Sequence, residues 1–493
     1  MARSPYLRAF SRAVQNSRKD AAPHFFDPAR RDFIRKSAAA AGLAAFSRLD
    51  PWGVSRMAWG SPLGSASDIC IIGGGIAGLT VAYRLAREKI ACTLYEGSSR
   101  LGGRILTYDR FNSDGMFCEL GGELIDTSHE EIVALAREIG VPVQTIDPPV
   151  EALEDLVFYF EGQRRYQKDL DSAVRGLAPL LARDIDAVFG PGGERVVHYK
   201  KYNEAGRRFD HQSLRDYLEL MSPHVDRWVL DMIAMGYMSE YGIEPEEQSA
   251  LNLLTLIDPN PGKDFRVVGD SDETIRIQGG NSRIIEGLER KIKDRVSVKL
   301  DKRLVKIKDL GSRFELTFSN GTTSETVRTS QVVCTLPFTL LREVEGIDKL
   351  SLSPAKSQAI SELGYGVHAK QMLSFKNRVW RKPIGTYPGC TGYGFSDLKS
   401  QVFWETSRAQ KGNSGILTCF IAGQAGGGTL PTADSHLVDL DRVFPGVAAT
   451  YDGRFAQYQW STSPFAKGSY ACPKRGQYTT LVGSAGEAEL GGR

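Results

Sequence analysis

The chain has 493 residues and a formal charge of +3, and its hydrophobic fraction of 41% and charged fraction of 25% are those of an ordinary folded protein. This composition excludes a collagen-like, coiled-coil or wholly disordered chain, and the length is typical of about two to four domains. Glycine is over-represented, since its 51 residues make about a tenth of the chain against a usual share of about 7%. Many of these glycines form doublets, which indicates backbone that closely approaches another group.

The N-terminus carries the basic excess. Residues 1–60 hold 11 Lys+Arg and 4 Asp+Glu, so residues 61–493 have a net charge of −4. Arg30-Arg31 precedes an aromatic residue, an aliphatic residue and two further bases, and then the weakly apolar segment 37–46. This order resembles a twin-arginine export signal, and the apolar segment is too short to span a membrane.

The resemblance implies that residues 1–66 are a signal and linker recognised by the twin-arginine export machinery. The protein would then fold, together with any cofactor that it binds, in the cytoplasm before it reaches the periplasm or is secreted. In the remaining chain no basic patch with interleaved aromatic residues indicates a nucleic-acid partner, and no long apolar helix indicates a membrane span.

The cysteines and histidines predict neither a disulfide framework nor a metal site. The seven cysteines are widely spaced and include no C-x-x-C pair, and the seven histidines form no cluster with metal-ligand spacing. Cys70 and Cys334 lie in apolar runs, so we expect both to be core thiols.

A β-α-β unit begins directly after the predicted linker. A β-branched run at 69–72 is followed by Gly73-Gly74-Gly75-Ile76-Ala77-Gly78, a helical stretch at 79–88 and a second strand at 91–95 that ends in Glu96. A strand, glycine loop and helix in this order, with an acid after the second strand, are typical of a dinucleotide-binding site. The alternative is a glycine-rich turn that binds no ligand.

Each part of this unit has a physical role. Gly73 permits the tight turn, Gly75 lets the backbone approach a pyrophosphate, and Gly78 lets the helix pack closely on the strand. The helix N-terminus presents free N–H groups to the phosphates. Glu96 would accept hydrogen bonds from a ribose diol.

Two further glycine doublets decide which dinucleotide is expected. Arg100-Leu101-Gly102-Gly103-Arg104 follows Glu96 closely, and Glu119-Leu120-Gly121-Gly122-Glu123 comes about fifteen residues later. A nicotinamide-dependent dehydrogenase needs neither segment. FAD lies extended along successive backbone segments, so the doublets favour a flavin.

From this point the sequence resembles the flavin-containing amine oxidase family. The resemblance continues in the family's order through Gln278-Gly279-Gly280-Asn281, 331–337, Gly366-Val367-His368-Ala369-Lys370-Gln371, and Trp460 followed by Pro464-Phe465 and Gly468-Ser469-Tyr470. It implies FAD, held noncovalently because Ser469 stands where covalently flavinylated members have a cysteine. The cofactor-binding residues that it implies are Gly73, Gly75, Ile76, Ala77, Gly78, Glu96, Gly97, Arg100, Gly102, Gly103, Arg104, Gly121, Gly122, Glu123, Val305 and Trp460.

The resemblance also implies the chemistry. A C–N bond of a primary or secondary amine is oxidised to an imine, and O2 is reduced to H2O2. Lys370 would be the residue beside the flavin that assists the reaction with oxygen, and Trp460 and Tyr470 would form aromatic walls of the amine site. The alternatives are a solvated lysine on a strand and two core aromatics.

Glu123 bears on the substrate. Venom-type L-amino-acid oxidases carry near this position an arginine that pairs with the substrate carboxylate, whereas this chain has Glu123-Leu124. A buried glutamate would repel a carboxylate and favour a second amine, unless another arginine reaches the site from the helical insert. An L-amino-acid oxidase therefore stays an alternative, as does a Glu123 that only caps the helix expected around 128–137.

We expect an α/β fold with a Rossmann-like FAD-binding domain and an interleaved substrate domain of mixed sheet plus helices. The predicted parts are 67–147, 276–346 and an incomplete 463–493 for the FAD-binding domain, and a helical 148–275 and a sheet at 347–462 for the substrate domain.

The family normally continues past this chain's last residue with a strand and a helix that face the flavin. A truncated, non-catalytic FAD-binding fragment or subunit is therefore a second class of function. A homodimer, or a second chain that supplies the missing part, is an expected partner in that case. A desaturase or protoporphyrinogen-oxidase-like enzyme fits less well, because Lys370 and the Trp460 to Tyr470 stretch resemble amine oxidases.

Overall fold

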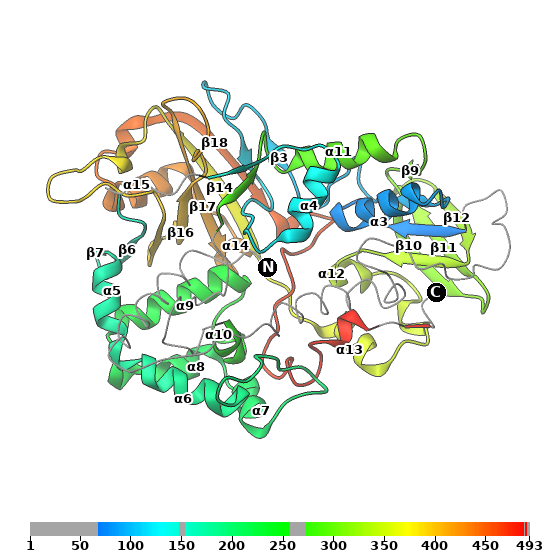
Figure 1. The fold of residues 1–493 in the computed structure, drawn as a ribbon, viewed down its shortest axis with the longest axis horizontal. Helices are drawn as coiled ribbons and strands as arrows, with labels where there is room; N and C mark the ends of the chain where they lie inside the picture. The colour runs from blue at the N-terminus through cyan, green and yellow to red at the C-terminus, as the bar shows by residue number, and fades with distance from the viewer. Residues whose placement is uncertain (1–67, 147–152, 257–272, 488, 491–493) are drawn as a thin grey trace.

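The computed structural model describes residues 68–146, 153–256, 273–487 and 489–490, and the predicted export signal lies outside these residues. The chain folds into two halves that lie side by side (Figure 1), which confirms the expected α/β class. We call them the parallel-sheet half and the mixed-sheet half. The chain crosses between them several times, so neither half is continuous in sequence.

The parallel-sheet half is built on four strands in the order β13-β1-β2-β9. Their bounds are β1 Ile69–Ile72, β2 Thr93–Tyr95, β9 Ser297–Lys299 and β13 Gln331–Cys334. The β-branched residues of β1 are buried on both faces, as expected for a central parallel strand. Helix α3, Ile76–Arg87, follows β1 after the glycine loop, and the β-α-β unit is therefore present as the sequence predicts.

This parallel sheet lies between two other layers. Helices α3 and α11, Ser282–Ile292, cover one face together with α4, Glu130–Glu138. An antiparallel sheet covers the other face, and its strands are β10 Arg303–Asp309, β11 Phe314–Ser319 and β12 Ser324–Thr329. Tyr95 and Phe318 stack across this second boundary with ring centroids 4.0 Å apart.

The mixed-sheet half contains seven strands in the order β18-β14-β17-β16-β15-β6-β7. Their bounds are β6 Val157–Phe160, β7 Gln163–Arg165, β14 His368–Phe375, β15 Gly394–Ser396, β16 Val402–Glu405, β17 Gly415–Ala422 and β18 Tyr451–Gln459. Only the β15–β6 pair is parallel. Strands β6 and β7 lie in a range that the sequence predicts to be helical, because their short apolar run is ambiguous in periodicity.

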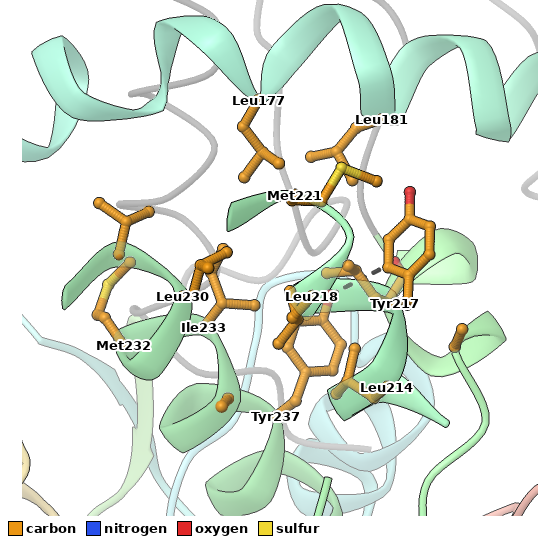
Figure 2. Close-up of a cluster of buried hydrophobic side chains, with 14 of the residues drawn as sticks. Leu177, Leu181, Leu214, Tyr217, Leu218, Met221, Leu230, Met232, Ile233 and Tyr237 are labelled. Atoms are coloured by element: carbon orange, nitrogen blue, oxygen red, sulfur yellow. Dashed lines mark hydrogen bonds between the residues drawn. The ribbon is translucent and has the colours of Figure 1, made fainter. Parts of the chain in front are cut away.

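Helices cover one face of the mixed sheet. They are α5 Gln167–Ala173, α6 Ala178–Phe189, α7 Glu204–His211, α8 Leu214–Glu219, α9 Arg227–Tyr241 and α10 Leu251–Leu256, and they lie below the sheet in the view of Figure 1. Figure 2 shows how the apolar side chains of these helices, such as Leu181, Leu218 and Ile233, point toward one another. This core continues to the sheet, where it includes Phe395 and Trp404.

The pairing register sorts the mixed sheet into two faces with different roles. Lys370 pairs with Phe420 of β17 and with Tyr458 of β18, so these three side chains lie on one face. Trp404 of β16 pairs with Thr418, which lies two residues before Phe420 on β17, so Trp404 is on the same face as Phe420. We call this face the site face. The opposite face is apolar and is covered by α15, Ala433–Val443.

Two smaller strand pairs connect the halves. Strands β3 Thr107–Tyr108 and β4 Cys118–Glu119 form one pair, and β5 Val143–Thr145 and β8 Ile275–Ile277 form the other. The residues directly after β4 and within β8 reach the site described below.

One expectation and one alternative interpretation are wrong. Cys70 is buried, but Cys334 is exposed, because β13 is the edge strand of the parallel sheet and its last residue is not covered. Glu123 does not cap a helix, since α4 begins at Glu130 and its N-cap residue is His129.

Within the described ranges, no helix combines the length and apolar character needed to cross a bilayer. The same residues contain no group of three His, Cys, Asp or Glu side chains arranged to hold a metal ion.

Candidate active site

The segment Glu119 to Glu123 lies at the centre of the candidate site. Lys370 of β14 donates from Nζ to the Gly121 carbonyl at 3.1 Å and to Glu123 Oε2 at 2.7 Å. Trp460 donates from Nε1 to the Leu120 carbonyl at 2.8 Å. Two of the three predicted catalytic residues therefore contact the same short segment, which begins in β4, a strand of one of the pairs that connect the halves.

Glu123 is held by cations on both sides. Its Oε1 accepts hydrogen bonds from Arg276 Nη2 at 3.1 Å and from the Thr406 hydroxyl at 3.0 Å, and its side chain is 2% exposed. Burial alone would raise the pKa of this carboxyl, but Lys370 and Arg276 hold it below its usual value. Glu123 is therefore an ionised, fully paired carboxylate.

Glu123 is therefore not the unpaired acid on which the expected repulsion of a substrate carboxylate depends. Two cations, Lys370 and Arg276, contact one carboxylate, so these three groups together carry an excess positive charge, which is offset when the nearby Glu119 is ionised. A positively charged site disfavours a substrate ammonium group, and it tolerates a neutral amine or an anionic group.

A second buried carboxyl lies at the start of the same segment. Glu119 accepts hydrogen bonds from the backbone N–H of Asn281 at 2.7 Å and from the Thr107 hydroxyl at 2.9 Å. Burial, with the added charge of Glu123, raises the pKa of Glu119 to about 7. Asn281 also donates from its side-chain amide to the Gly122 carbonyl, so α11 fixes the segment from its N-terminal end.

Aromatic side chains surround Lys370 on the site face. Its Nζ lies 5.1 Å from the ring centroid of Trp404, within the range of a cation–π contact. Phe420 packs edge-on against Trp404 at 5.5 Å, and Tyr458 lies 4.5 Å from Trp460. Lys370 is 4% exposed, so it is not the solvated lysine of the alternative interpretation.

Tyr470 is the third predicted catalytic residue. Among the described residues it shows no contact with the Lys370 ammonium group, and it is linked to Lys370 only through His368. Its ring packs against His368, which is two residues before Lys370 on the same face of β14. Burial, with the charge of Glu240 as a smaller cause, raises the pKa of the Tyr470 phenol well above its usual value.

The glycine loop has the shape that a bound phosphate group requires. A Cβ on Gly78 would lie 1.9 Å from the Gly73 carbonyl, so helix and strand pack closely there. A Cβ on Gly75 would instead meet only the Cα of Gly103 at 3.9 Å, and one on Gly122 would meet nothing within 4 Å. These open glycines form a cradle that side chains would fill.

The N-terminus of α3 faces this cradle without a competing group. Its N-cap residue, Gly75, offers no side chain, its first turn carries no acidic residue, and Ala77 is exposed. Such an end binds anions through its free N–H groups and the helix dipole. The glycine loop therefore fits a dinucleotide phosphate.

The remaining predicted cofactor residues surround the same loop. Glu96 is buried and accepts a hydrogen bond from the Gly74 N–H at 2.7 Å. Arg100 donates to the carbonyls of Leu101, Gly103 and Ile105, so it shapes its own loop.

Three further predicted cofactor residues have contacts outside the glycine loop. Arg104 donates to the Ser469 carbonyl and so ties this loop to the segment that carries Tyr470. Gly97 lies against Phe465, and Val305 sits at the register shift between β10 and β11.

Sequence reasoning missed Arg276, Trp404, Thr406 and Phe420. A charged residue inside the apolar strand Ile275–Ile277, just before Gly279-Gly280, was a signal for Arg276. The strands β16 and β17 gave no comparable signal, because their contacts with Lys370 depend on pairing between distant segments.

Arg408 lies beside this cluster. Its carbonyl accepts a hydrogen bond from Arg276 Nη1 at 2.6 Å. Among the residues that the structure describes, its guanidinium has no hydrogen-bond or ion-pair partner, and the side chain is half-buried. Burial, with the nearby charge of Arg276, lowers the pKa of this guanidinium.

The comparison with protein families decides the identity. The family model for flavin-containing amine oxidoreductases matches residues 76–491. The chain belongs to this family. The flavin that the family contains fits the glycine loop, the cradle and the open end of α3 described above.

Two relatives of this flavin-containing amine oxidoreductase show a distant similarity in sequence. It is 24% identical over 79% of its length to a lysine-specific histone demethylase 1 homologue of Oryza sativa, and it spans only 46% of that protein. It is 22% identical over 87% of its length to an L-amino acid dehydrogenase of Synechocystis, and it covers 88% of that protein.

A solved structure supports the fold. Cyclohexylamine oxidase from Brevibacterium oxydans superposes with a TM-score of 0.68 at 17% identity, and the match covers 85% of this chain and 90% of that one. At this identity the likeness shows a shared fold, and the substrate of this chain does not follow from it.

Proposed function

We propose that this chain is an FAD-dependent amine oxidase that oxidises a C–N bond of a primary or secondary amine to an imine and passes the electrons to O2, which gives H2O2. The observation that carries the proposal is the burial of Lys370 among aromatic side chains, directly on the glycine-rich segment 119–123. FAD supplies the redox chemistry when it is bound, by accepting two electrons and the hydrogen from the substrate carbon.

The chain's own residues would bind, orient and shield the substrate. Trp404 and Phe420 exclude water around Lys370, and Trp460 closes the side toward segment 119–123. The excess positive charge of Lys370 and Arg276 disfavours an ammonium form, so the amine would bind neutral. Lys370 would present its ammonium group to the charge that develops as oxygen is reduced.

A peroxide-coupled assay over a panel of aliphatic, aromatic and polyamine substrates tests this proposal. We expect H2O2 production with at least one class, together with bleaching of the flavin absorbance when the substrate is added without oxygen. Protein that retains FAD and shows neither response with any substrate would favour the non-catalytic FAD-binding fragment. Bleaching without H2O2 would indicate an acceptor other than O2.

Arg408 favours an L-amino acid as a second candidate substrate. An unpaired guanidinium beside a cluster of excess positive charge suits a carboxylate, and a relative that covers most of this chain is named as an L-amino acid dehydrogenase. The test compares an amino acid with the amine that lacks only its carboxylate, such as L-phenylalanine and phenethylamine.

For an amino-acid substrate, we expect Arg408→Met to raise KM for the amino acid by about tenfold or more and to leave KM for the amine unchanged. Lys411→Met, in the same loop and exposed, is the matched control. Equal effects of Arg408→Met on both substrates would exclude a carboxylate-binding role.

Noncovalent attachment of FAD is supported by Ser469, whose hydroxyl is hydrogen-bonded within the protein. Acid precipitation should release yellow FAD into the supernatant, and flavin that stays with the pellet would contradict this. Export is tested by replacing Arg30 and Arg31 with Lys and fractionating the cells. Retention of the variant in the cytoplasm, with the unchanged chain in the periplasm or medium, is the expected result.

A further inference from the structure

We propose that His368 is a positioning residue that sets the orientation of Tyr470 and thereby shapes the amine side of the candidate active site. The part that Tyr470 plays as a wall of that site rests on the proposed function, whereas the contacts between the two residues do not. His368 is 1% exposed and lies on the site face of β14, two residues before Lys370.

The imidazole lies between two aromatic rings. Phe420 stacks on it with ring centroids 4.5 Å apart and an interplanar angle of 9°. Tyr470 packs on it at 4.9 Å with an angle of 38°. His368 therefore fixes the spacing between an aromatic residue of β17 and one of the segment after Gly468.

Both ring nitrogens are used. Nε2 lies 3.0 Å from the Ser239 carbonyl of α9 and 3.3 Å from the Tyr470 hydroxyl, and Nδ1 lies 2.6 Å from the Ser469 hydroxyl. Because a carbonyl can only accept, the Ser239 contact places the ring hydrogen on Nε2. Nδ1 then shares the single hydrogen of the Ser469 hydroxyl with the Gly366 carbonyl, which lies 2.9 Å from that hydroxyl. Burial lowers the pKa of His368 to about 4, so the ring stays neutral at ordinary pH.

The ring cannot easily move away from these contacts. Gly242, which ends α9 with a φ of +75°, lies so close that a Cβ there would be 2.3 Å from His368 Cε1. Arg104, in the loop after Glu96, donates to the Ser469 carbonyl, so Ser469 is held by Arg104 as well as by His368. The Ser469-Tyr470 segment is therefore held between the loop that carries Arg104 and the mixed sheet. His368 is the residue of the mixed sheet that contacts it.

The chain offers a matched control. His436 of α15 is fully buried, its Nδ1 lies 2.8 Å from the Ser400 hydroxyl, and its Nε2 lies 2.7 Å from Gln371 Oε1. It packs behind the opposite face of the same sheet, away from Lys370. A histidine that matters only for stability should behave as His436 does.

The experiment uses the FAD-loaded full chain with His368→Phe, Tyr470→Phe, the double variant and His436→Phe. His368→Phe keeps a ring against Phe420 and removes both nitrogen contacts. We expect it to raise KM for the best amine by about tenfold, the size of one hydrogen bond, with kcat changed by less than about threefold. Adding Tyr470→Phe to it should change KM by less than about twofold, because both changes disturb the same contact.

His436→Phe should lower the melting temperature by about as much as His368→Phe does, but it should leave KM unchanged. His368→Gln, whose amide nitrogen can replace Nε2, should restore KM toward the wild-type value. An unchanged KM in His368→Phe, an equal KM rise in His436→Phe, or effects of His368→Phe and Tyr470→Phe that multiply would each overturn the proposal.

Visible circular dichroism of the bound FAD separates this proposal from the proposed function. His368→Phe and Tyr470→Phe should change that spectrum in the same way, and His436→Phe should not, even if no amine is turned over. Absence of turnover with a shared spectral change would contradict the oxidase function alone. Unchanged spectra in both variants would contradict the positioning role alone.

Discussion

Lys370 and Glu123 form a buried ion pair, with Nζ 2.7 Å from Oε2, although they are 247 residues apart in the chain. Glu123 follows β4, beside the parallel-sheet half, and Lys370 lies on β14, the second strand from one edge of the mixed sheet. The pair therefore joins two segments that are far apart in sequence, one beside the parallel-sheet half and one in the mixed-sheet half.

Replacing Lys370 by methionine should abolish most of the activity without releasing the cofactor. The ammonium group that stabilises developing charge is lost, whereas the glycine cradle is untouched, so we expect kcat to fall by about a hundredfold or more. Turnover and the flavin-to-protein absorbance ratio measure the two effects. Lys376→Met, at an exposed position directly after the same strand, should change neither value.

Replacing Glu123 by glutamine should destabilise the fold, because it leaves Lys370 and Arg276 buried without a counter-charge. We expect a loss of about 3–5 kcal/mol in the free energy of unfolding, measured with urea. The double variant Glu123→Gln, Lys370→Met should recover part of this loss, since only one cation is then uncompensated. A loss below about 1 kcal/mol in the single variant would mean that the pair contributes little to stability.

Two glycine variants should separate cofactor binding from folding. Gly75→Ala has room for its methyl group in the polypeptide, so we expect a folded protein whose affinity for FAD is at least about tenfold weaker, because the methyl group fills the cradle. Gly78→Ala places a Cβ 1.9 Å from the Gly73 carbonyl and should impair folding itself. FAD titration and far-ultraviolet circular dichroism measure the two outcomes. Equal loss of structure in both variants would contradict the distinction.

Glu119 should make stability depend on pH between about 4.5 and 7. Its pKa is raised from 4.5 to about 7 in the fold, so its favourable contribution is complete below pH 4.5 and is lost as the pH rises to about 7. The stability of Glu119→Gln minus that of the unchanged protein should therefore grow by roughly 3 kcal/mol across this range and stay constant above it. Glu131→Gln, at an exposed position, should show no such trend.

The sequence predicted the parts of the site that are local in the chain. The glycine loop, its strand and its helix lie within residues 69–96, so their order alone indicates a dinucleotide site. The resemblance to a known family also located Lys370 and Trp460, which the structure brings to one segment.

The sequence could not predict the charge state of the site. Glu123 reads as an unpaired acid in sequence, because its partners Arg276 and Lys370 come from distant strands whose pairing no local pattern reveals. Cys334 was misplaced for a related reason, since an apolar strand looks the same in sequence at the centre and at the edge of a sheet.

The pairing of β1 with β13 has a consequence for the timing of biosynthesis. The hydroxyl of Thr335, just after β13, donates to the Ile72 carbonyl beside the glycine loop, across 263 residues of sequence. At about 5–20 residues per second, the ribosome needs roughly 13–50 seconds to make the intervening chain. The nascent glycine loop lacks β13 throughout that interval, so we expect flavin to bind only after the chain through Thr335 has been made.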